Sequence, residues 1–228
     1  MMKSGIDQDA MIKMFSEASA RQGQALRQAV GDATLKALQG RELTLQNIRG
    51  VLKTVTQAAS AGAAQNPAPA VDVEAMLTNA FAGMDAALLQ AVEANRKALE
   101  QFVSQGVGVQ QTQMKSALAN LEKMEDTFFA TVTKAAQSVS APLQGPWAHV
   151  LEAMKLQGTA TGAQATMTVE QVMAQAQSAM RAGRATSMNA VQAMMDSYAA
   201  LVSGVLIGMS EGLSKGAATP PPAGRGRK

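Results

Sequence analysis

The chain has 228 residues, of which 47% are hydrophobic, 3% are aromatic and none is cysteine. This length allows one or two domains, and the absence of cysteine excludes disulfides and thiolate metal sites. The formal net charge of +3 resides in Arg225, Arg227 and Lys228, because the other 17 of the 20 basic residues are balanced by 17 acidic residues. A body without net charge has no bulk attraction for nucleic acid, so this tail is the candidate nucleic-acid contact.

Residues 1–64 are expected to form a helical hairpin. Asp7 is a suitable N-cap for the first helix, and Gly40 is expected to end it. The second helix resumes near Glu42. Its apolar residues recur at steps of three and four, the period of one helix face: Leu45, Ile48, Leu52, Val55 and Ala59.

Prolines mark the later boundaries, because proline in a helix interior costs about 3 kcal/mol. Pro67 and Pro69 indicate one break, and Pro142 and Pro146 indicate another, with a short helix starting at Pro146. The short helix is expected to end at Gly158. The predicted segments are a Pro/Ala linker at 65–71, a central helical pair at 72–140, a break with a short helix at 141–159, a long C-terminal helix at 160–216 and a disordered basic tail at 217–228.

The central pair begins at Asp72, a favourable N-cap, and carries a long apolar face. Asn95 interrupts this face, either at a solvated rim, which we expect, or as a polar residue that fixes helix register. Gly106 and Gly108 then allow the two helices of the pair either to fold back as a hairpin or to continue as one bent rod. The residues expected to bind an apolar surface or another copy are Leu77, Phe81, Met84, Leu88, Val92 and Leu99.

The C-terminal helix carries apolar residues spaced by eleven. Eleven residues make about three helical turns, so such a repeat keeps one stripe on one side of a nearly straight helix. A helix over 160–216 would be roughly 80 Å long, too long for one copy of the chain to shield, so we expect self-association. The stripe consists of Val169, Met180, Val191, Val202 and Leu213.

A glycine series near the end of this helix is spaced by four. Glycine is a poor helix former by about 1 kcal/mol relative to alanine, so a close helix contact or insertion into an apolar layer is expected to compensate. The alternative is a frayed helix end that leads into the tail. The series is Gly204, Gly208, Gly212 and Gly216.

The chain offers little reaction chemistry. His149 is the one histidine, and we expect it to be packed or partly exposed beside Trp147 rather than catalytic. Glu122, Glu125 and Asp126 surround Lys123 on an amphipathic helix and are expected to lie on a solvated face. We therefore predict neither catalytic residues, nor a metal site, nor a cofactor.

Two sets of segments resemble known families. ARQGQALRQAV, ANRKALEQFVSQG and the basic tail after the last prolines resemble phasins, helical proteins that coat polyhydroxyalkanoate storage granules in bacteria. The resemblance implies a helical, granule-associated protein. TLQNIRGVLKTVTQAASAGAAQNPAP and YAALVSGVLIGMSEGL are also similar to an uncharacterised bacterial family of helical proteins.

Together these patterns predict an all-α fold of long amphipathic helices, in an extended bundle or a coiled-coil-like assembly. The leading hypothesis is a non-enzymatic, phasin-like coat or scaffold protein, cytoplasmic and granule-associated, that forms homo-oligomers and has no transmembrane span. The first alternative is a self-assembling bundle or filament protein. The second is a nucleoid-associated protein that uses the basic tail.

Overall fold

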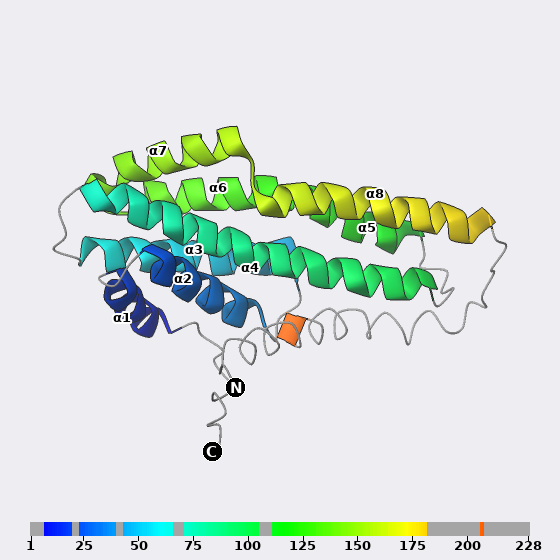
Figure 1. Ribbon diagram of the computed structural model, residues 1–228, viewed down its shortest axis with the longest axis horizontal. Coiled ribbons are helices and arrows are strands. Elements are labelled where there is room, and N and C mark those ends of the chain that lie inside the picture. Colours follow the sequence, from blue (N-terminus) through cyan, green and yellow to red (C-terminus); the bar gives the residue numbers. More distant parts are fainter. Residues whose placement is uncertain are drawn as a thin grey trace, which may run out of the picture.

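The computed structural model describes residues 7–19, 23–39, 43–65, 71–104, 111–181 and 206–207. Every regular element in these ranges is a helix, which confirms the predicted all-α class. The helices pack into an elongated bundle (Figure 1). In chain order they are α1 (Gln8–Ser19), α2 (Gly23–Leu38), α3 (Leu45–Ala64), α4 (Val71–Ser104), α5 (Gln111–Glu122), α6 (Met124–Gln137), α7 (Ala141–Gln157) and α8 (Ala160–Arg181).

The longest described helix, α4, has 34 residues and runs through the whole bundle (Figure 1). At 1.5 Å per residue it is about 51 Å long. It packs most extensively against α2 and α8, and it also contacts α3 and α7. The other long helix of the N-terminal half, α3, packs between α1 and α6. Each described helix therefore packs on α3, on α4 or on a helix that contacts one of these two.

The N-terminal segment contains three helices instead of the expected hairpin of two. Asp7 caps α1 as predicted, because its Oδ1 accepts a hydrogen bond from the Ala10 N–H at 3.0 Å. The unexpected boundary lies between Ser19 and Gly23. Residues 19–23 contain no proline, so the prolines that we used to predict helix boundaries did not indicate this one. Gly40, the expected helix end, lies outside the described residues.

The two halves of the central pair fold back as a hairpin. Phe81, near the start of α4, stacks on Phe128 of α6 with ring centroids 4.5 Å apart and an interplanar angle of 23°. Such a contact requires α5 and α6 to return along α4. The glycines of the expected turn, Gly106 and Gly108, lie outside the described residues.

The prolines at the next boundary lie inside a helix. The expected start at Pro146 is wrong, because α7 begins at Ala141, Pro142 occupies its first turn and Pro146 lies within it. The N–H that Pro146 lacks would have paired with the carbonyl of Pro142, so only one bond near the helix end is lost. The predicted end at Gly158 is confirmed, and this residue adopts φ +73°.

A chain of buried polar groups joins three helices. The Trp147 indole Nε1–H donates to Ser60 Oγ at 2.9 Å, and Ser60 in turn donates to the Thr56 carbonyl at 2.7 Å. The Thr56 hydroxyl lies 3.6 Å from the sulfur of Met84. Trp147, the largest core side chain, is thus positioned against α3 by a satisfied hydrogen bond as well as by burial.

Of the long C-terminal helix expected over 160–216, the structure describes only α8, Leu206 and Ile207. Such a helix would carry Leu206 about 37 Å beyond Arg181. Instead, Leu206 is fully buried and belongs to the same cluster of apolar side chains as the bundle helices.

Two helix crossings depend on glycine. A Cβ at Gly83 of α4 would overlap the carbonyl oxygen of Arg27 and lie 3.0 Å from the backbone nitrogen of Gly31 in α2. A Cβ at Gly62 of α3 would lie 2.9 Å from the Cβ of Phe15 in α1. The backbones of these helix pairs approach too closely for a larger side chain.

Replacing Gly83 with alanine is expected to lower the free energy of unfolding by about 1–3 kcal/mol, because the methyl group overfills the crossing. The matched control is Gly50→Ala in α3, where nothing lies within 4 Å of the added Cβ. That control should stabilise by about 0.5–1 kcal/mol through helix propensity. Urea unfolding followed by circular dichroism measures both, and a Gly83→Ala protein as stable as the wild type would contradict the close crossing.

Candidate surface-binding site

The apolar face predicted on α4 is present, but its expected exposure is wrong. The six predicted residues are at most 3% exposed within a single chain: Leu77, Phe81, Met84, Leu88, Val92 and Leu99. Neighbouring helices of the same chain enclose them, because alanine and glycine on α4 let those helices approach closely. In this structure the face is the protein's own core and meets neither a second copy nor an external surface.

Asn95 lies in this core and not at the expected solvated rim. It is 9% exposed, and its Nδ2 donates to the Ala91 carbonyl at 2.9 Å. A buried amide is tolerated where it is hydrogen-bonded. The bond to the preceding helical turn explains how a polar residue fits a face that is otherwise apolar.

Much of the predicted C-terminal site lies outside the described residues. Val169 is described and is 8% exposed, on the inner side of α8. The rest of the predicted set falls outside the described side chains: Met180, Val191, Val202, Leu213, Gly204, Gly208, Gly212, Gly216, Arg225, Arg227 and Lys228.

Three exposed large apolar side chains lie on α7 and α8. Leu156 is 84% exposed, Met167 62% and Met173 48%. The other two such residues in the described part of the chain are Met14 of α1 and Ile207. The most exposed of the five, Leu156, Met167 and Met173, therefore all belong to α7 or α8.

The first turn of α8 is held by carboxylates from two other helices. Asp85 of α4 accepts from the N–H groups of Ala160 and Thr161, each at 3.0 Å. Glu125 of α6 accepts from the Thr159 N–H at 3.1 Å and from its hydroxyl at 2.5 Å. These contacts, which we call the α8 clamp, satisfy N–H groups that a helix start leaves without intrahelical partners.

Two further contacts complete this turn. The Thr159 hydroxyl accepts from the Gly162 N–H at 2.9 Å, as an N-cap threonine does. The Thr161 hydroxyl donates to the backbone carbonyl of Asp85 at 2.9 Å. Sequence reasoning missed this junction, and its one local signal is a threonine directly after a helix-ending glycine.

Beyond the clamp, a polar seam joins α4 to α8. Gln164 Nε2 donates to Glu93 at 3.0 Å, and Gln171 Nε2 donates to Glu100 at 2.9 Å. Arg96 bridges the two carboxylates: it forms a bidentate pair with Glu93 and donates to Glu100 at 2.6 Å. We call these five residues the α4–α8 seam. The residue numbers of the paired side chains increase in the same direction along both helices, so α8 runs parallel to α4.

The seam has defined electrostatics. The hydrogen bond from Arg96 lowers the pKa of the Glu93 carboxyl below its ordinary value of 4.5, although partial burial acts in the opposite direction. The same contact raises the pKa of the Arg96 guanidinium. Both groups therefore remain charged at neutral pH, and Glu93 accepts the hydrogen bond from Gln164 of α8 as a carboxylate.

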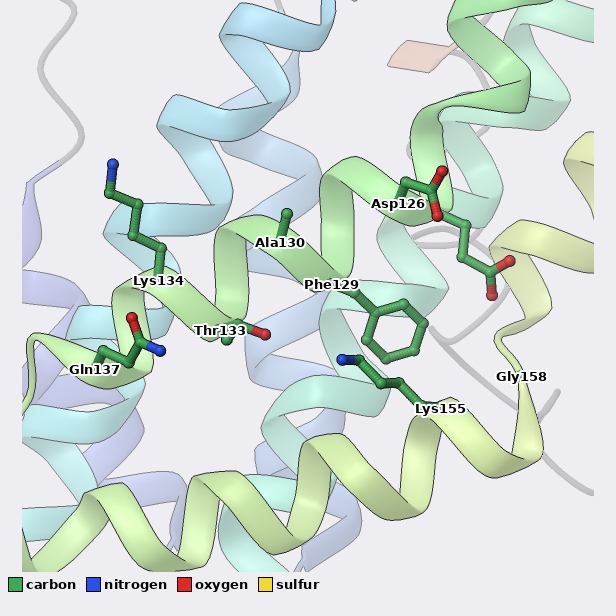
Figure 2. Close-up of a pocket in the computed structure, with 9 residues that line it drawn as sticks. Asp126, Phe129, Ala130, Thr133, Lys134, Gln137, Lys155 and Gly158 are labelled. Atoms are coloured by element: carbon green, nitrogen blue, oxygen red, sulfur yellow. The ribbon is translucent and has the colours of Figure 1, made fainter.

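A groove of about 740 Å³ lies between α6 and the C-terminal end of α7 (Figure 2). Its lining mixes acidic, basic and aromatic side chains, among them Asp126, Phe129 and Lys155. Glu125 also borders it, and this corrects the expectation that Glu125 lies on a solvated face, because its carboxylate caps α8. The groove combines both charge signs and carries no group poised for reaction.

The remaining candidate groups are at the surface. The side chain of His149 is 69% exposed, consistent with the partly exposed alternative, and its Nδ1 lies 3.7 Å from Glu74. Within the described part of the chain, no three acidic or histidine side chains are grouped to hold a metal ion. No helix among the described residues is both long and apolar enough to cross a membrane.

Acid is expected to weaken the seam. The pKa of Glu93 is lower in the folded chain than in the unfolded chain, so the stabilisation from this carboxylate is complete above its ordinary pKa and is lost as the pH falls through the folded value. Urea unfolding between about pH 5 and pH 3 should therefore show a steeper loss of stability in the wild type than in Glu93→Gln. Arg96→Met should flatten the slope in the same way, and equal slopes in all three proteins would refute the coupling.

Comparison with known proteins identifies a family but supplies no function. Neither the curated proteins nor the solved structures contain a match to this chain. Residues 1–215 match a family described as a family of unknown function, DUF6781. This agrees with the similarity to an uncharacterised helical family. Because the match spans almost the whole sequence, the chain belongs to the DUF6781 family.

Proposed function

We propose that this protein is a non-enzymatic coat or scaffold protein that binds a hydrophobic surface, such as a polyhydroxyalkanoate storage granule. The observation that carries the proposal is the exposure of Leu156, Met167 and Met173 on α7 and α8. Amphipathic helices bind interfaces by burying such side chains. Two of the three are methionines, whose flexible thioethers adapt to an irregular surface.

The charge of the chain supports the same proposal. Residues 1–216 carry equal numbers of acidic and basic side chains. A neutral polymer provides no anionic groups, so a coat protein for it needs no basic face. The similarity of ARQGQALRQAV and ANRKALEQFVSQG to phasins points to the same kind of surface.

Replacing Leu156, Met167 and Met173 together with glutamine is expected to weaken binding to purified polyhydroxyalkanoate granules by at least about ten-fold. The reason is that full burial of each such side chain contributes roughly 1.5–3 kcal/mol to the free energy of binding, and partial burial at the granule surface contributes a fraction of that. Co-sedimentation over a range of granule concentrations measures the affinity, and it should be performed at low and high salt.

The matched control is Met14→Gln, which changes an exposed methionine on α1. Binding by this variant should equal that of the wild type. If wild-type protein stays in the supernatant at both salt concentrations, the proposed function is wrong. If the triple variant binds as well as the wild type, α7 and α8 are not the binding surface.

Self-assembly is the second candidate function, and one observation favours it. Gln171 pairs with Glu100 only four residues before α4 ends at Ser104, whereas α8 continues to Arg181. The last turns of α8 therefore lie beyond the last described residue of α4 (Figure 1), and a second copy that packs against them would bury them. Sedimentation velocity should then show a discrete oligomer whose population rises with protein concentration. A monomer at all concentrations would exclude this candidate.

A further inference from the structure

The link between α7 and α8 is short and has one special residue. Only Gly158 and Thr159 separate the two helices. Gly158 adopts φ +73°, which glycine accommodates and other residues rarely do, and nothing packs within 4 Å of its missing Cβ. A rotation about this residue would move α8 as one body and leave α7 in place.

The described inner face of α8 contributes smaller side chains to the core than α6 does. Among the described side chains of α8, the buried ones are small or polar except for two valines: Thr161, Ala165, Thr168, Val169 and Val172. The hydroxyl of Thr168 is buried and finds no hydrogen-bond partner among the described residues. A buried polar group without a partner opposes the closed arrangement. By contrast, α6 contributes Phe128, Met124 and Val132 to the core.

Polar contacts therefore supply much of what holds α8. The α8 clamp fixes its first turn, and the α4–α8 seam fixes the register further along. The seam side chains are partly exposed, so water can replace each of these bonds when α8 leaves. Release then loses the apolar packing of the inner face on α4, together with the contacts of α8 with α5 and α6.

An apolar row on α4 lies beside the residues that bind α8. On α4, Leu88, Val92 and Leu99 follow Asp85 at helical spacing and lie on the same side as Arg96 of the seam. Leu88 and Val92 are fully buried and Leu99 is nearly so. Removal of α8 would expose part of this leucine and valine row.

We propose that α8 is a releasable strap, which pivots at Gly158 and uncovers the apolar row of α4 when the protein meets a hydrophobic surface. This inference rests on the proposed function and adds its regulation. In the closed form only the outer side chains of α7 and α8 contact the surface. In the open form the row on α4 and the valines on α8 bind as well, and the apolar area they bury offsets the loss of the clamp and seam.

Thiol labelling tests the opening. The chain has no cysteine, so Val172→Cys introduces one reporter on the inner face of α8. The closed strap predicts slow labelling, and Asp85→Asn combined with Glu125→Gln should accelerate it about ten-fold or more, because lost helix caps typically weaken a helix start to that extent. Fluorescence of Trp147, the single tryptophan, should show that the rest of the bundle remains folded.

The matched control is Val132→Cys on α6, which is as buried as Val172. Its labelling should be slow and unaffected by the two clamp substitutions. If Val172→Cys labels no faster than Val132→Cys in the clamp variant, α8 opens only with global unfolding and the strap is refuted.

A crosslink tests the role at the surface. Glu93→Cys with Gln164→Cys allows a short bis-maleimide to tie α8 to α4 across the seam. The tied protein should bind polyhydroxyalkanoate granules at least about ten-fold more weakly than the same variant before crosslinking, because it cannot expose the row. Equal binding by both forms refutes the strap but leaves the proposed function standing. Rapid labelling without granule binding by either form refutes the proposed function instead.

Discussion

The apolar face of α4 constrains the rest of this structure. Buried side chains such as Leu77, Met84 and Leu99 extend along most of a helix that is about 51 Å long. A helix of that kind must be covered along its whole length, and one partner helix is too short to do so. The chain covers it in sections, with α2 beside the first half and α8 beside the second half. The elongated shape follows from this division.

The two sections are covered by different physical means. Toward the N-terminal end of α4, helices approach closely at Gly31 and Gly83, and aromatic side chains such as Phe81 and Phe128 stack in the core. Toward its other end, α8 packs with threonine, alanine and valine and depends on carboxylates for its position. The first section has the dense apolar packing of an ordinary core. The second combines smaller apolar side chains with hydrogen bonds to carboxylates.

Sequence periodicity predicted the helical class and the apolar face of α4, because a helix repeats its environment every three or four residues whatever its neighbours are. Local capping signals predicted Asp7 and Gly158 for the same reason. Periodicity could not say what would cover the face. The same row of leucines is expected whether the apolar face packs against the same chain, a second copy or a polymer. The expectation that this face would stay exposed therefore had no independent support.

The carboxylate contacts at the start of α8 could not be predicted from the sequence, for a related reason. Asp85 lies 75 residues before Ala160, and nothing near Asp85 in the sequence marks it as a cap for a distant helix. Glu125 is no more conspicuous, because its neighbours Glu122 and Asp126 give it the appearance of an ordinary solvated residue. Only the folded arrangement assigns these carboxylates their partners.

The closed bundle and the surface-binding hypothesis are compatible if the apolar face is covered reversibly. A protein that exposed Leu88, Val92 and Leu99 permanently would aggregate through them before reaching any surface. A cover made of leucine and phenylalanine would prevent this but would release only with unfolding. The cover provided by α8 is intermediate, since it excludes water from the row while its own inner face contains a buried hydroxyl without a partner, that of Thr168, among the described residues. That hydroxyl lowers the free-energy difference between closed and open arrangements, while release at a surface is favoured over release in water because apolar contacts replace the lost packing only at the surface.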